Sequence, residues 1–237
     1  MNLAVALVNE NKKVLVIDLD AQDNASKILI GGKNHTKKTV TELLETVKNG
    51  NEPNYEEYIS LSEDGVSFIG SSNLLSNTEI GLAGEMFRET VLKRGLQSIK
   101  VEYDYVILDC PPSIGVITIN ALAAADDVII PVQSNDYFCL DGLMELMKYI
   151  KLMKTNINPS INVAGILITK YSPVTNITKL VCEMVDKNTS IPVFDTKISI
   201  STKVAESVAV RKSIFSYAAK DRVADDYKNL AKEVLNL

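Results

Sequence analysis

Short apolar runs alternate along the chain with longer segments in which apolar residues recur at helical spacing. The runs are typical of strands buried on both faces, and they predict strands at 14–17, 66–70, 103–109, 127–132, 161–169 and 193–198. The longer segments predict helices at 2–11, 39–48, 76–100, 114–125, 136–154, 174–187 and 221–235. This alternation predicts a three-layer α/β/α fold with a mostly parallel, doubly wound sheet.

No segment rich in proline, glycine and serine divides the chain, so we expect a single domain over residues 1–237. Hydrophobic residues make up 46% of the sequence, and no apolar run reaches the ~20 residues that span a bilayer. The net charge of −5 argues against a protein that coats nucleic acid with its whole surface, although a local basic patch remains compatible with it. The three cysteines form no CxxC pair, which argues against a zinc site and favours reduced, cytosolic thiols.

Two of the predicted strands end in carboxylates. Asp18 and Asp20 follow the strand at 14–17, and Asp109 closes the apolar run at 105–108. Open α/β sheets bind ligands beyond the carboxyl ends of their strands, so these carboxylates could gather Mg²⁺ and aim a water for phosphoryl transfer. The alternative is structural: the second strand simply stops at Asp109, and Asp18 or Asp20 caps the following turn.

Phosphoryl transfer also needs a phosphate cradle, a glycine-rich loop that ends in Lys and Ser or Thr. The nearest candidate is Gly31-Gly32-Lys33-Asn34, but the required spacing would place a glycine at Lys27, and Asn34 is neither Ser nor Thr. This stretch also follows no predicted strand. We therefore interpret it as a plain loop and find no cradle in the 237 residues.

Several longer motifs resemble the ParA/Soj family of DNA-partition ATPases, which are relatives of MinD. They occur in the family's order over nearly the whole chain, at 14–22, 24–26, 103–113, 120–126, 130–133 and 140–143. The resemblance implies a nucleotide hydrolase that uses ATP and Mg²⁺, dimerises around ATP and binds DNA non-specifically. It also implies a ParB-like centromere-binding partner and a cytoplasmic, nucleoid-associated location, with no membrane contact.

The resemblance further assigns roles to matching residues. It makes Asp20 the residue that positions the attacking water, Asp18 its acidic partner near Mg²⁺, and Asp109 the residue that holds Mg²⁺ through water. It places nucleotide-binding loops at Cys110, Pro111, Pro112 and Ser113, and at Thr169, Lys170 and Tyr171. It offers candidate contacts to DNA phosphates at Lys203, Arg211 and Lys212, for which a solvated basic face is the alternative. Family members often carry Pro-Arg-Asn where this chain has 199–201, so contacts to the base are open.

The family begins with a strand and a Lys-Gly-Gly-x-Gly-Lys-Thr loop, followed by a helix that resembles residues 2–7. We therefore expect an N-terminally truncated member that lacks the first strand and the P-loop, with the full protein beginning about 25 residues earlier. We also expect impaired ATP binding and hydrolysis. One alternative is a non-catalytic paralogue without a P-loop that acts as an interaction or regulatory protein. A lower alternative is a MinD-like positioning ATPase, although the mixed charge at 221–237 differs from a basic membrane helix.

Overall fold

The computed structural model describes residues 1–32 and 37–237. Its strands are β1 (Val14–Asp18), β2 (Ile59–Leu61), β3 (Ser67–Ile69), β4 (Tyr105–Asp109), β5 (Asp127–Gln133) and β6 (Asn162–Thr169). Its α-helices are α1 (Asn2–Asn9), α2 (Asn24–Ile30), α3 (Val40–Lys48), α4 (Leu75–Leu82), α5 (Val91–Gly95), α6 (Val116–Ala124), α7 (Cys139–Asn156), α8 (Asn176–Asn188), α9 (Thr202–Ala209), α10 (Ile214–Ala218) and α11 (Arg222–Val234). Short 3-10 turns lie at η1 (Tyr55–Glu57), η2 (Arg88–Thr90) and η3 (Lys100–Glu102).

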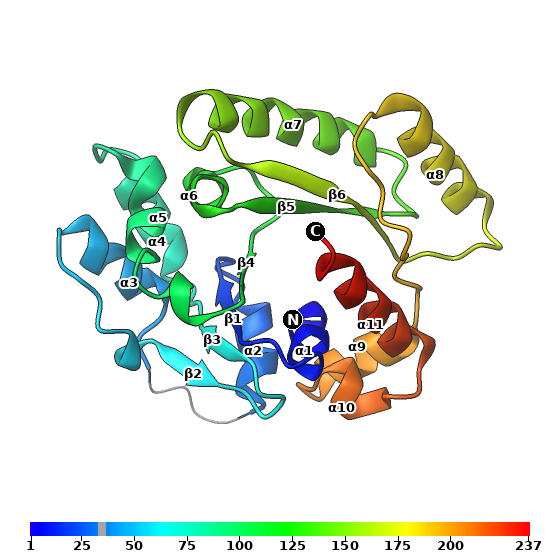
Figure 1. Ribbon diagram of the computed structural model, residues 1–237, viewed down its shortest axis with the longest axis horizontal. Helices are drawn as coiled ribbons and strands as arrows, with labels where there is room; N and C mark the ends of the chain where they lie inside the picture. Colours follow the sequence, from blue (N-terminus) through cyan, green and yellow to red (C-terminus); the bar gives the residue numbers. More distant parts are fainter. Residues whose placement is uncertain (33–36) are drawn as a thin grey trace.

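The strands form a four-stranded sheet in the order β2-β3-β1-β4 and a separate pair, β5-β6 (Figure 1). All pairings are parallel except β2 with β3, which confirms the predicted mostly parallel α/β class. The expectation that the first strand of the fold is absent is wrong. Strand β1 lies in the interior of the larger sheet, with a strand on each side, and all five of its residues are buried.

The apolar core consists of three clusters that place helices on both faces of the larger sheet. Alternate residues of a strand point to opposite faces. Val14 and Val16 of β1 accordingly pack into the cluster that contains residues of α1 and α11. Leu15 and Ile17 pack into a second cluster, with residues of α3, α5 and α6. A third cluster joins β5 and β6 to α7 and α8.

Several predicted elements differ from the structure. The helix predicted at 76–100 is broken into α4, η2 and α5, with Phe87 in the left-handed region at φ 56°. The strand predicted at 193–198 makes only isolated pairings, although the backbone of Phe194 donates to Ile166 O at 3.0 Å. Helices α2, α9 and α10, each of eight residues or fewer, were not predicted.

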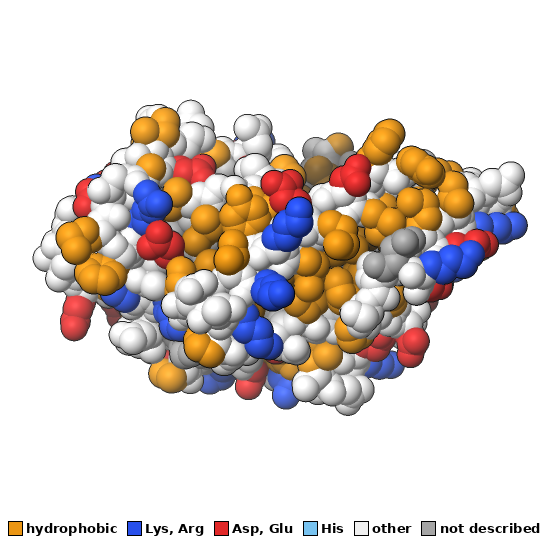
Figure 2. Space-filling view, turned by 90° about the horizontal axis from the view of Figure 1, so that it is seen from above, with side chains coloured by type: hydrophobic (Ala, Val, Ile, Leu, Met, Phe, Trp, Pro, Cys, Tyr) orange, Lys and Arg blue, Asp and Glu red, His pale blue; other side chains and the backbone are white. Residues whose placement is uncertain are grey.

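Figure 2 shows the molecule from the side on which α7 lies in Figure 1. Hydrophobic side chains gather over much of this face, and lysine or arginine side chains run across its middle. Met144 and Leu152 of helix α7 are exposed apolar side chains. Among the described residues, no helix has the length and apolarity needed to cross a bilayer.

Candidate nucleotide site at the strand ends

The carboxyl ends of β1 and β4 lie side by side, as predicted for a ligand crevice. Asp18 and Asp109 are register partners in the two parallel strands. The backbone N–H of Leu19 then donates to Asp109 O at 2.8 Å, which holds the turn after β1 against the end of β4. The structure therefore brings Asp18, Asp20 and Asp109 to one edge of the sheet.

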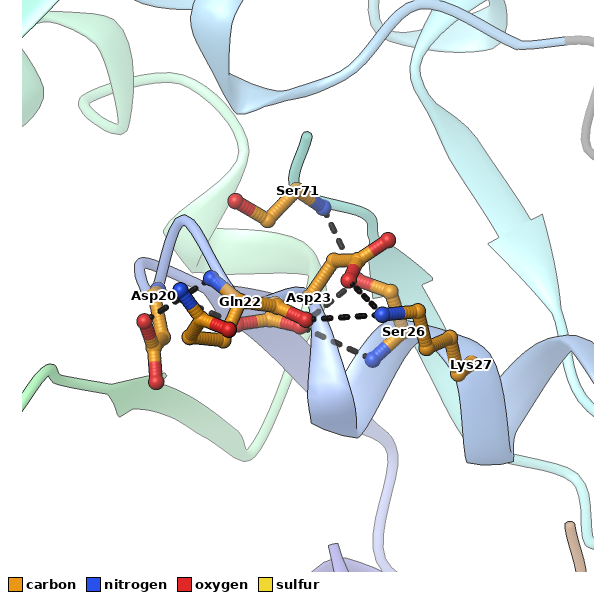
Figure 3. A network of polar contacts seen from close by, with 7 residues as sticks. Asp20, Gln22, Asp23, Ser26, Lys27 and Ser71 are labelled. Carbon is orange, nitrogen blue, oxygen red and sulfur yellow. Dashed lines mark hydrogen bonds and ion pairs between the residues drawn. The ribbon is translucent and has the colours of Figure 1, made fainter. Parts of the chain in front are cut away.

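The side chain of Asp18 is buried and turned toward helix α2. Its Oδ2 accepts from the backbone N–H of Ser26 at 2.8 Å and from Ser26 Oγ at 2.7 Å, and its Oδ1 accepts from the N–H of Asp20 at 3.1 Å. Ser26 Oγ in turn accepts from the N–H of Ser71 at 2.8 Å (Figure 3). Burial raises the pKa of Asp18, while the hydrogen bonds from Ser26 and Asp20 oppose that rise. Both lone pairs of Oδ2 are therefore used by the protein.

Asp20 and the loop after β4 line one pocket of about 220 Å³, here called the strand-end pocket. Its lining residues are Leu19, Asp20, Ala21, Leu75, Ser76, Glu79, Pro111, Pro112, Ser113 and Ile117. The only charged side chains among them are the carboxylates of Asp20 and Glu79. A pocket lined by carboxylates repels a polyphosphate unless a cation stands between them.

Sequence reasoning missed Glu79, which joins α4 to the start of α6. Its Oε1 accepts from the backbone N–H of Ile117 at 3.4 Å. The same oxygen would be only 2.0 Å from a Cβ atom on Gly115, so the glycine leaves room for the carboxylate. A carboxylate is favourable at a helix N-terminus because the unpaired N–H groups and the helix dipole attract negative charge. Nothing in the sequence around Glu79 signals this long-range contact.

Asp109 and Cys110 do not line the strand-end pocket. Cys110 is exposed as a residue, yet partial removal of its sulfur from water, with a smaller contribution from the Asp109 carboxylate, raises the pKa of this cysteine, so the thiol stays protonated at neutral pH. Among the described residues, no three His, Cys, Asp or Glu side chains form a metal-binding group. The exposed carboxylate of Asp109 fits an Mg²⁺ held through water, which needs only one or two protein carboxylates.

Tyr171 lines a second pocket of about 260 Å³, here called the Tyr171 pocket. The rest of its lining is Ser172, Pro173, Ser199, Ile200, Ser201, Asp221, Arg222 and Val223. Thr169 and Lys170 do not line it. Their side chains bond to β5 instead: Lys170 Nζ donates to Gln133 Oε1 at 2.8 Å, and Thr169 Oγ1 donates to Val132 O at 3.2 Å. Of the three residues predicted for this loop, Tyr171 alone lines the Tyr171 pocket.

The candidate DNA contacts lie on and after α9. Lys203 Nζ is 2.8 Å from Glu206 Oε2, so its charge is already paired. Arg211 and Lys212 are exposed in the connection from α9 to α10, and Arg211 adopts a left-handed conformation at φ 55°. The loop at 31–34 is only partly described. Gly31 ends α2 in the left-handed region at φ 65°, which agrees with a plain loop, whereas Lys33 and Asn34 lie outside the described residues.

Comparisons with known proteins identify the family. The family model of an AAA domain matches residues 1–163. The chain is 34% identical to the sporulation initiation inhibitor protein Soj of Bacillus subtilis over 99% of this chain and 90% of that protein. It is 32% identical to the chromosome partitioning protein ParA of Myxococcus xanthus, over 99% of this chain and 81% of the relative.

Solved structures share the fold of this chain. Cobyrinic acid a,c-diamide synthase from Mycobacterium smegmatis, with bound ATP analog and magnesium, superposes with a TM-score of 0.84 at 27% identity, covering 99% of this chain and 86% of that one. A putative plasmid partition protein from Borrelia burgdorferi bound to AMPPNP reaches 0.78 at 21% identity, covering 99% and 90%, which shows the shared fold.

These findings correct the expectation of an N-terminally truncated member. The family match begins at residue 1, the relatives align with 99% of the chain, and β1 is present as a central strand. The chain belongs to the ParA/Soj family of partition ATPases and has their P-loop NTPase fold.

Proposed function

We propose that this protein is a ParA/Soj-type ATPase that acts in the segregation of chromosomal or plasmid DNA, with ATP and Mg²⁺ as ligands. The observation that carries the proposal is the pairing of Asp18 with Asp109 at adjacent strand ends, next to a pocket lined by Asp20. In this arrangement Asp20 positions the attacking water and Asp109 holds Mg²⁺ through water. Non-specific DNA, a ParB-like protein and a second copy of the chain are the proposed partners, and the cytoplasm is the proposed location.

Asp18 receives a different role from the one expected. Because Ser26 and Asp20 occupy its oxygens, we assign it to positioning the loop that carries Asp20 and not to direct metal binding. Pro111, Pro112 and Ser113 supply part of the wall of the strand-end pocket. Tyr171 is the proposed contact to the base of the nucleotide. Lys197 Nζ lies 5.0 Å from the centre of the Tyr171 ring.

Hydrolysis of MgATP tests the role of Asp20. Asp20→Ala should lower the rate of phosphate release at least tenfold, because the attacking water loses the carboxylate that orients it. Asp23→Ala is the matched control, since Asp23 lies three residues away and does not line the strand-end pocket. Equal rates for the two variants would contradict the assignment.

Affinity for MgATP tests how well the 237-residue chain binds nucleotide. We expect weak binding, because the charged residues lining the strand-end pocket are acidic. Isothermal calorimetry should give a dissociation constant well above the micromolar range. Micromolar affinity would show that other groups supply the phosphate contacts.

The acidic lining also favours a second candidate, a non-catalytic protein that binds the same partners without turning over ATP. That candidate predicts DNA or ParB-like binding that MgATP leaves unchanged. A MinD-like membrane role receives no support from the last helix. The apolar residues of α11 are buried against α1 within the core and face no membrane.

A further inference from the structure

The strand-end pocket has two walls that come from different parts of the chain. One wall follows β1 and contains Asp20, and another belongs to α4 and contains Leu75, Ser76 and Glu79. Strands β1 and β3 are parallel neighbours in the sheet, so both walls start from adjacent strand ends. The role proposed for Asp20 needs these walls at a fixed distance, because a carboxylate that is misplaced orients the attacking water poorly.

Ser26, in helix α2, joins the two walls although it does not line the pocket. Its hydroxyl donates to Asp18 Oδ2 at 2.7 Å and accepts from the backbone N–H of Ser71 at 2.8 Å (Figure 3). Ser71 follows β3, and the next carbonyl, Ser72 O, accepts from the N–H of Leu75 at 3.0 Å, where α4 begins. One hydroxyl therefore connects the end of β1 to the segment that leads into α4.

On the β1 side, the connection continues to the carboxylate of Asp20. Asp18 Oδ1 accepts from the N–H of Asp20 at 3.1 Å, and Asp20 Oδ1 accepts from the N–H of Gln22 at 3.0 Å. The turn is closed by a bond from the N–H of Asp23 to Asp20 O at 2.9 Å. Because Asp18 is held by Ser26 and in turn holds the backbone of Asp20, the orientation of the Asp20 carboxylate depends on Ser26.

Burial restricts this network to one arrangement. Asp18 is 1%, Ser26 2% and Ser71 8% exposed. A buried carboxylate or N–H that loses its partner is costly, because water cannot take the place of the partner. The hydroxyl of Ser26 satisfies one group of each kind at once, so a shift of either wall would leave a buried polar group unpaired.

We propose that Ser26 is a positioning residue for ATP hydrolysis, which fixes Asp20 relative to the α4 wall of the strand-end pocket. This inference rests on the proposed function and adds to it a residue outside the pocket lining. Such a residue acts on the transition state through the geometry of another group. Its loss should therefore lower kcat and leave the KM for MgATP nearly unchanged.

Steady-state hydrolysis by the intact chain, measured up to millimolar MgATP, tests the inference. Ser26→Ala should lower kcat at least about tenfold, with a change in KM of less than about twofold. A change in KM alone would overturn the inference, because it would place Ser26 in ground-state binding and not in positioning.

Two control variants separate positioning from a general loss of stability. Ser71→Ala removes a buried hydroxyl that has no hydrogen-bond partner among the described residues, and it keeps the N–H that bonds to Ser26. Gly165→Ala, in β6, destabilises the fold outside the pocket, because its Cβ would lie 3.0 Å from Pro192 O. Both should keep kcat within about twofold of the wild type. Equal losses of kcat in Ser26→Ala and Gly165→Ala would refute a positioning role.

Amide hydrogen exchange of the ligand-free chain gives a second readout that needs no turnover. In Ser26→Ala, the amides of Asp20 and Ser71 should exchange at least about tenfold faster relative to those of β1, whereas Gly165→Ala should not single them out. Unchanged relative exchange in Ser26→Ala would overturn the inference even if the chain hydrolyses ATP. Equal hydrolysis by the wild type and Asp20→Ala would instead contradict the proposed function, and the exchange data would still decide whether Ser26 fixes the Asp20 turn.

Discussion

At the scale of single residues, Ser26 connects the turn after β1 to the end of β3. Its hydroxyl donates to Asp18 and accepts from the backbone N–H of Ser71. Ser26→Ala should lower the free energy of unfolding by about 1–3 kcal/mol, because the buried carboxylate loses a donor and a buried N–H loses its acceptor. Urea denaturation of the wild type and the variant measures the difference.

Ser71→Ala is the matched control for Ser26→Ala. The buried Ser71 Oγ has no hydrogen-bond partner among the described residues, and the Ser71 N–H would keep its bond to Ser26. Removing an unpaired hydroxyl should leave stability unchanged or raise it slightly. A loss as large as that of Ser26→Ala would show that the network of Figure 3 is not the source of the effect.

From the sequence we could predict that the carboxylates at the strand ends lie close together, but not which groups each carboxylate hydrogen-bonds. Asp18 and Asp109 were expected together because the ends of parallel strands share an edge, and the register confirms it. The direction of the Asp18 side chain depends on Ser26, eight residues on, at the start of a helix that was not predicted. A local pattern cannot reveal such contacts, and the same holds for Glu79 and Ile117.

At the scale of elements, the helices predicted at 136–154 and 221–235 are confirmed as α7 and α11, whereas the helix predicted at 76–100 is broken and several short helices were not predicted. The helix predicted at 39–48 is confirmed as α3, which begins with a capping box in which the side chains of Thr39 and Glu42 pair with backbone N–H groups. The segment at 193–198 contains apolar residues suited to a strand, yet it pairs with β6 only at isolated points. The extended conformation of this segment therefore depends on these separate contacts with β6 and not on a continuous strand pairing.

Gly165 of β6 tests how closely that segment packs. A Cβ on this residue would lie 3.0 Å from Pro192 O and 3.1 Å from the ring of Phe194. Gly165→Ala should therefore destabilise the fold by about 1–3 kcal/mol, because a backbone carbonyl and a packed ring must both move. Gly142→Ala, in α7 with open space around it, should instead stabilise by up to about 1 kcal/mol. Thermal unfolding of both variants gives the comparison, and a neutral Gly165→Ala would contradict this packing.

At the scale of the whole molecule, a net charge of −5 means that DNA binding must depend on a local surface. Arg211 and Lys212 offer two exposed cations between α9 and α10, whereas Lys203 is paired with Glu206. If the first two contact DNA phosphates, each releases about one counterion on binding, so the dependence of affinity on salt reports them directly.

Fluorescence anisotropy with random-sequence duplex DNA, over a range of salt with and without MgATP, measures that dependence. Arg211→Ala and Lys212→Ala should each reduce the slope of log affinity against log salt by about 1 and weaken binding to all sequences alike. Lys203→Ala is the matched control and should change the slope less, because Glu206 already neutralises its charge. Equal slopes for all three variants would indicate a solvated basic face, and the DNA surface would then have to be sought among the lysines of α7.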